Sequence, residues 1–200
     1  MWEIILAAGW PIWPLIFASI IALAIIGERF WSLRHEIVAP SDLLPEVQKL
    51  LNQGVIKKDV IAKIKEHSLL GEIFASALIN SNTSAAHIKE AIEESGRGVN
   101  YKLEKYLPTL GTIAAVAPLL GLLGTVIGMV DLFSSFTSSG HDVAVFARGI
   151  SVALYNTAAG IVVAVPAMIF YRFFRSKVDD LIFDMEQQAL KLIESMDVRK

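Results

Sequence analysis

Three long stretches of the chain, 4–27, 106–130 and 149–171, contain no Asp, Glu, Lys, Arg or His. A helix needs roughly 20 apolar residues to cross the hydrocarbon core of a bilayer, and each stretch exceeds that length. A hydrophobic content of 54% and a mean hydropathy of +0.53 favour the same class of protein. We therefore predict an all-α, polytopic membrane protein with three transmembrane helices, rather than a soluble domain with three buried helices.

The distribution of basic residues predicts the orientation. Arg148 is the only one of the 18 Lys and Arg residues that lies outside 28–105 and 172–200. Because basic residues collect on the cytoplasmic side, we expect the N-terminus outside and the C-terminus in the cytoplasm. No basic residue precedes the first stretch, so we interpret it as a retained anchor and not as a signal peptide. A net charge of −2 provides no field to attract nucleic acid.

These boundaries predict six segments. They are a periplasmic N-terminus with the first span (1–27), a cytoplasmic helical domain (28–105), the second span (106–133), a short periplasmic loop (134–144), the third span (145–171) and a cytoplasmic C-terminal helix (172–200). Within the domain we expect helices over 43–53, 57–67 and 69–82, and a longer one after the capping residue Ser84. Before the second span the only breaker is Pro108, so this last helix is expected to continue into the membrane. An apolar stripe in the C-terminal helix is expected to pack on the other cytoplasmic helices; it consists of Val178, Leu181, Met185, Ala189, Leu192 and Met196.

Small residues recur at helical spacing in the second and third spans. Such residues let membrane helices approach closely, and glycine weakens a helix, so the stripes predict tight backbone contacts. The predicted packing residues are Ala117, Gly121, Gly124, Gly128, Gly149, Ala153, Gly160 and Ala164. Their spacing favours equally a contact within one chain and a contact in a homo-oligomeric ring. Pro118 and Pro166 remove backbone hydrogen bonds and are predicted to kink the two spans.

A few polar residues interrupt the apolar spans. Thr125, Thr157, Asn156 and Ser151 form a predicted polar seam that lines a passage. The alternative for the threonines is a local bond to the carbonyl three or four residues back, whereas the amide of Asn156 needs a partner in lipid.

The spans contain no carboxylate, His or Lys. Proton movement through a membrane needs a group that titrates there, so a partner must supply it or water must fill the passage. We find no nucleophile–base pair, metal-ligand cluster or phosphate loop, and predict no enzymatic activity and no cofactor. Asp131 and Arg148 bracket the outer loop, either as independent interfacial charges or as a pair.

Two motifs resemble one known family. PLLGLLGTVIGM at 118–129, together with GISVALYNTAAG at 149–160 and VAVPA at 163–167, is similar to the second-span and third-span signatures of the MotA/TolQ/ExbB proton-channel family. Glu28, Arg29 and Phe30 also fit its first span, and the ExbB-like members resemble this chain most. Some members have a Glu five residues before the third-span threonine, where this chain has Val152.

The resemblance implies a function. Such subunits form a homo-oligomeric ring, a pentamer in well-known members, around an ExbD-like partner whose single span supplies a membrane Asp. Thr125 and Thr157 match the pore-lining threonines that face this Asp. The complex of the bacterial inner membrane uses the proton motive force, and a TonB-like protein transmits the work to outer-membrane transporters. The alternatives are a TolQ-like role in envelope integrity and a scaffold that does not conduct ions.

Overall fold

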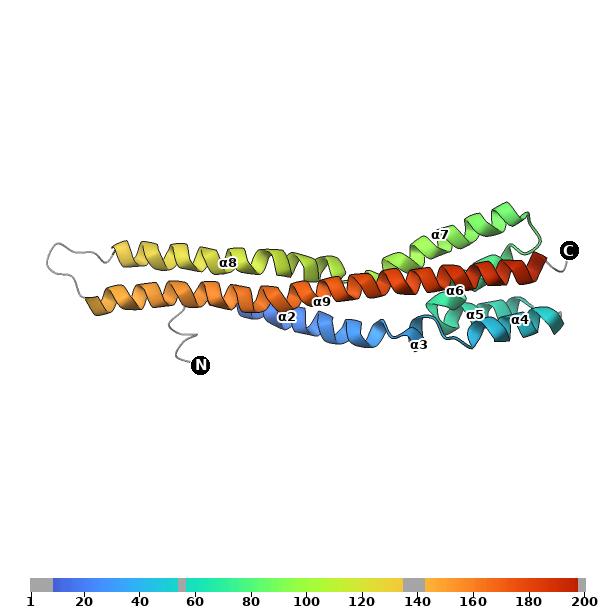
Figure 1. Ribbon diagram of the computed structural model, residues 1–200, viewed down its shortest axis with the longest axis horizontal. Coiled ribbons are helices and arrows are strands. Elements are labelled where there is room, and N and C mark those ends of the chain that lie inside the picture. The colour runs from blue at the N-terminus through green and yellow to red at the C-terminus, as the bar shows by residue number, and fades with distance from the viewer. Residues whose placement is uncertain (1–8, 54–56, 135–142, 198–200) are drawn as a thin grey trace. The chain divides into compact units, whose positions relative to one another are not determined.

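The computed structural model describes residues 9–53, 57–134 and 143–197, and in this part of the chain every regular element is a helix. The helices are α2 (Ile12–Ser32), α3 (His35–Val38), α4 (Leu43–Gln53), α5 (Lys58–His67), α6 (Leu69–Ile79), α7 (Ala85–Leu103), α8 (Leu107–Ser134) and α9 (Val143–Asp197) (Figure 1). Among the described residues, three helices are long and apolar enough to cross a membrane, over Ile12–Ser32, Leu107–Val130 and Gly149–Met196. The all-α class and the three candidate spans are confirmed, whereas their orientation and the ring stay predictions.

The chain divides into two compact units. Met1–Gly27 and Tyr106–Phe173 make up the first, here called the membrane unit, and Glu28–Lys105 with Phe174–Lys200 make up the second, here called the extramembrane unit. The helix α9 is continuous from Val143 to Asp197, so the third span and the C-terminal helix are one element. Both internal prolines, Pro118 and Pro166, lie inside unbroken helices, and the predicted kinks stay predictions.

The first long helix, α2, extends beyond the charge-free stretch at its C-terminal end. The helix α2 begins at Ile12, after a turn at Trp10 and Pro11, and continues past Gly27 to Ser32. Gly9, before this turn, has a φ of +73°, a conformation that suits glycine. The charge-free stretch 4–27 therefore overlaps α2 from Ile12 onward, and its residues 4–8 lie outside the described part of the chain.

The expected continuation from the extramembrane helix into the second span is wrong. The helix α7 ends at Leu103, α8 begins at Leu107, and Tyr106 between them has a φ of 67°. Non-glycine residues adopt positive φ only in breaks of regular structure. Pro108 lies in the first turn of α8, where its missing N–H costs no hydrogen bond. The proline thus marks the beginning of a new helix and not a kink in a continuous one.

The core of the extramembrane unit surrounds α6. Ser68 caps this helix by accepting a hydrogen bond from the N–H of Gly71 at 3.1 Å. Most of the α6 side chains are buried, with Leu70 and Phe74 at 0% exposure, and α5 and α7 pack on this helix. The predicted stripe of α9 is confirmed, because Val178, Leu181, Met185, Ala189 and Leu192 are buried, while Met196 is partly exposed. Large apolar side chains therefore hold this unit together.

Candidate functional site

The small residues of α8 and α9 bring the two helices into backbone contact. A Cβ atom at Gly121 would lie 2.7 Å from the carbonyl oxygen of Asn156. One at Gly160 would lie 2.7 Å from the carbonyl oxygen of Ala117. No real Cβ atom approaches a backbone oxygen so closely, so only glycine fits at either position. This part of the stripe acts within one chain.

The helices α8 and α9 run antiparallel (Figure 1), and their contact continues toward the C-terminal end of α8 and the N-terminal end of α9. Gly128 faces Ala153, and a Cβ at Gly149 would lie 2.8 Å from the side chain of Leu132. Ala153 and Ala164 are 5% and 6% exposed. The spacing left open a contact within one chain and a contact in a ring. The structure places these residues in contacts within one chain.

Asn156 lies inside this helix pair. Its side chain is 1% exposed, and a Cβ atom at Gly124 would lie 2.6 Å from its Cβ atom. Its Nδ2 donates a hydrogen bond to the carbonyl oxygen of Val152 at 3.3 Å. The glycine therefore makes room for the amide between the helices. Within one chain Asn156 faces α8, which does not favour its predicted place on the wall of a passage.

Thr125 and Thr157 lie at one level of the membrane unit. Gly124, directly before Thr125, contacts Asn156, directly before Thr157. Both threonines are partly exposed. The Oγ1 atom of Thr125 donates to the carbonyl oxygen of Leu122 at 2.7 Å, which is the expected local bond. The hydroxyl oxygen still has lone pairs to accept a further hydrogen bond.

The first long helix, α2, covers one flank of the α8–α9 pair. Leu15 of α2 packs with Ala117 and Ala164, and with Leu120, Ala159 and Val163 beside them. At about 100° per residue, Leu120 and Thr125 lie on opposite sides of the small-residue stripe of α8. Val163 and Thr157 are separated in the same way on α9. Since α2 covers the side of Leu120 and Val163, both threonines lie on the flank that α2 leaves open.

Ser151 does not join this flank. By the same spacing its side chain points away from α8; it is exposed, and its Oγ donates to the carbonyl oxygen of Ala147 at 2.9 Å. The four predicted seam residues are therefore divided: two hydroxyls share an open flank, Asn156 is buried, and Ser151 lies on the outer face. The side chains of Asp131 and Arg148 lie outside the described part of the chain, so their pairing stays a prediction.

Arg29 is a structural site that sequence reasoning did not single out beyond its place in a motif. The side chain is only 4% exposed, forms an ion pair with Glu28, and donates from Nη1 to the carbonyl oxygen of Leu103 at 3.1 Å. The last carbonyls of a helix have no partner within the helix and carry negative partial charge. Arg29 therefore stabilises the end of α7. The only signal for this role in the sequence is a cation directly after an apolar run.

Comparisons with known proteins identify the family of the chain. The sequence model of the MotA/TolQ/ExbB proton channel family matches residues 63–187. An ExbB-like biopolymer transport protein of Synechocystis is 35% identical over 179 residues, which are 86% of this chain and 83% of the relative. The exbB1 biopolymer transport protein of Vibrio cholerae is 28% identical over 80% of this chain and 72% of its own length.

A second branch of the family is similar as well. The TolQ protein of the Tol-Pal system of Pseudomonas aeruginosa is 30% identical over 89% of this chain and 78% of its own length. The family match covers more than half of the chain, including both signature spans and the extramembrane helices α6 and α7. The chain is thus a non-enzymatic membrane transport component, and it belongs to the MotA/TolQ/ExbB proton channel family.

Proposed function

We propose that this chain is an ExbB-like subunit of an inner-membrane motor that harnesses the proton motive force. An ExbD-like single-span protein is its partner, and a TonB-like protein carries the work to outer-membrane transport. In this proposal the chain assembles as a ring, with its N-terminus outside and its C-terminus in the cytoplasm. The observation that carries the proposal is the open flank with Thr125 and Thr157 at one level of the membrane unit.

The flank suits a partner's carboxyl group. No residue of 107–130 or 149–171 is an Asp, Glu, His, Lys or Arg, so in this proposal another chain supplies the group that carries the proton. An ionised Asp at the centre of a bilayer costs about 2.5–3.5 kcal/mol on insertion scales. A threonine hydroxyl donates to the ionised carboxylate and accepts from the protonated acid. Hydroxyls repeated around a ring would therefore lower the cost of both states.

Removing either hydroxyl tests this role. Thr125→Val and Thr157→Val keep the side-chain shape and remove a hydrogen bond to a charged group, which is worth about 1.5–3 kcal/mol. We expect a loss of proton flux of about tenfold or more, since 1.4 kcal/mol corresponds to a factor of ten. The flux is measured in liposomes that contain the chain and its ExbD-like partner, under an imposed pH gradient.

A matched control is available on the same helix. Thr112 is exposed on the face of α8 away from α9, and its Oγ1 donates to the carbonyl oxygen of Pro108 at 2.9 Å. Thr112→Val should leave the flux unchanged. Unchanged flux in both flank variants would reject the pore assignment, and an absence of flux from the unaltered complex would favour a scaffold without conduction.

A TolQ-like role in envelope integrity is the second candidate. It is supported by the 30% identity to the Tol-Pal protein TolQ over 89% of this chain. Both roles would use the same membrane engine, so the flux experiment does not separate them. Co-purification of the unaltered complex with a TonB-like or a TolA-like protein does.

A further inference from the structure

The facing surfaces of α8 and α9 in the membrane unit consist mainly of small residues. On α8 these are Ala114, Ala117, Gly121, Gly124 and Gly128, and on α9 they are Gly149, Ala153, Gly160, Ala164 and Ala167. Such surfaces allow close approach, but they are smooth and repeat at about each helical turn. Small residues alone therefore do not distinguish one register of the two helices from another that is displaced by a turn.

Two larger side chains interrupt these surfaces. Asn156 of α9 is 1% exposed, and a Cβ atom at Gly124 would lie 2.6 Å from its Cβ atom. Leu132 of α8 is 5% exposed, and a Cβ atom at Gly149 would lie 2.8 Å from its Cδ1 atom. Each large side chain thus occupies the space that a glycine of the opposite helix leaves. The Nδ2 atom of Asn156 also donates to the carbonyl oxygen of Val152 at 3.3 Å, which holds the amide in place.

These two contacts together oppose a slide of α8 along α9. A slide by part of a turn would move Asn156 away from glycine and toward the larger leucine, valine and isoleucine side chains of α8. A slide by one full turn could seat Asn156 at Gly128, which now faces Ala153. The same slide would set Leu132 against Ala153, where a methyl group stands in place of the glycine hydrogen. The two large side chains therefore find room together only in the observed register.

A slide in the opposite direction meets a different obstacle. Ala164 of α9 packs with Ala117 of α8. One turn of displacement would set Ala164 against the larger Ile113 instead. In coiled coils a single buried asparagine fixes the register of otherwise uniform helices. The membrane unit has the same combination of a uniform surface and one buried amide.

We propose that Asn156 is a positioning residue for the threonines of the open flank, and that together with Leu132 it fixes the register of α8 on α9. Gly124 directly precedes Thr125, and Asn156 directly precedes Thr157, so the contact of the first residues sets the level of the second. The positioning role rests on the proposed function, in which both hydroxyls serve one carboxyl group of the partner. A slide of one turn would displace one hydroxyl relative to the other by about 5.4 Å along the axis, roughly twice the length of a hydrogen bond.

Spin labels measure the register directly, since the chain contains no natural cysteine. Thr112→Cys and Leu154→Cys place labels at exposed positions of α8 and α9. Because Gly128 faces Ala153, the two labels are separated along the axis by about 22 Å, and their distance changes with any slide. The full-length labelled chain is diluted with an excess of cysteine-free chain, so that only distances within one copy contribute. Pulsed electron paramagnetic resonance should give one narrow distance.

Asn156→Ala removes the amide without adding volume. The backbone contacts at Gly121 and Gly160 do not use the amide, so the membrane unit should stay folded and resistant to protease. We expect a broader distance distribution and a several-fold loss of proton flux in liposomes with the ExbD-like partner. Leu132→Ala is the second variant. It removes the obstacle to a one-turn slide and should add a second distance that is longer by about 5.4 Å.

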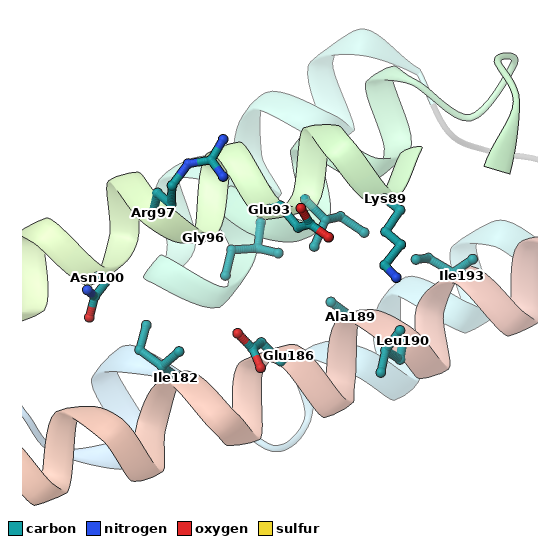
Figure 2. A pocket seen from close by; sticks show the side chains of 12 residues that line it. Lys89, Glu93, Gly96, Arg97, Asn100, Ile182, Glu186, Ala189, Leu190 and Ile193 are labelled. Atoms are coloured by element: carbon teal, nitrogen blue, oxygen red, sulfur yellow. The ribbon is translucent and has the colours of Figure 1, made fainter. Parts of the chain in front are cut away.

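Asn100 provides the matched control in the extramembrane unit. It lies at one end of a groove of about 510 Å³ between α7 and α9 (Figure 2). It is partly exposed, and its Nδ2 atom donates to Oε1 of Glu104 at 3.3 Å. This amide therefore lies at an open surface and not between two backbones. Asn100→Ala should leave both the distance and the flux unchanged.

The outcomes separate this proposal from the proposed function, because the distance measurement needs neither a partner nor a flux. An unchanged distribution in both Asn156→Ala and Leu132→Ala overturns the fixed register, even if the complex conducts protons. If Asn156→Ala loses its protease resistance, a single unshifted distance in Leu132→Ala overturns it. A broader distribution with unchanged flux overturns the positioning role of Asn156. Altered distances in the variants, with no flux from the unaltered complex, support the fixed register and reject the proposed function.

Discussion

In the membrane unit the helices meet at glycine and alanine, whereas in the extramembrane unit they meet at phenylalanine, leucine and methionine. Lipid is as apolar as the side chains, so helices there gain little from burying large groups and associate by close packing. In water, the burial of each large apolar side chain contributes about 1.5–3 kcal/mol to stability. The way helices pack in each unit therefore suits the solvent that surrounds that unit.

This comparison predicts its largest effect at Gly121. Gly121→Ala places a methyl group 2.7 Å from the carbonyl oxygen of Asn156, so α8 and α9 must separate along their whole contact. We expect loss of the folded membrane unit, measured as protease sensitivity and loss of assembly in native membranes. Gly128→Ala is the control, because its Cβ would lie 3.7 Å from Ala153, an ordinary contact. Equal tolerance of both variants would contradict the close-packing account.

A smaller but still large effect is expected in the core of the extramembrane unit. Phe74→Ala removes a side chain with 0% exposure and should cost about 3–5 kcal/mol of stability through lost burial and the cavity left behind. This cost is measured by chemical denaturation of the whole chain in detergent, with proteolysis of the extramembrane unit as the readout of unfolding. Ile79→Ala, at 64% exposure, should change stability by at most about 0.5 kcal/mol. If the two substitutions cost the same, large-residue packing does not hold this unit.

The smallest of the three effects concerns the end of α7. Arg29→Gln removes a buried charge that donates to the carbonyl oxygen of Leu103, and should cost about 1–3 kcal/mol. Amide exchange should accelerate in the last turn of α7 and leave α6 protected. The control is Arg34→Gln, because Arg34 is exposed and its Cζ lies 4.6 Å from the centroid of the Trp31 ring. Faster exchange throughout the unit would show that Arg29 supports the core rather than this helix end.

Local patterns predicted much of the extramembrane unit. The bounds of α4 and the buried stripe of α9 follow from helical periodicity, and the start of α7 follows from the capping residue Ser84. The break between α7 and α8 was missed because Tyr106 carries no local signal for a positive φ.

The sequence by itself determined the helical class, the three candidate spans, the absence of a proton carrier within them and the family, because these depend on composition and order along the chain. The tertiary structure decided how the polar seam is divided: Asn156 is buried against Gly124, and Thr125 and Thr157 lie on the flank that α2 leaves open. Helical spacing gives only a direction around one helix. Which side is covered depends on where a third helix packs, and that is a contact between residues far apart in sequence.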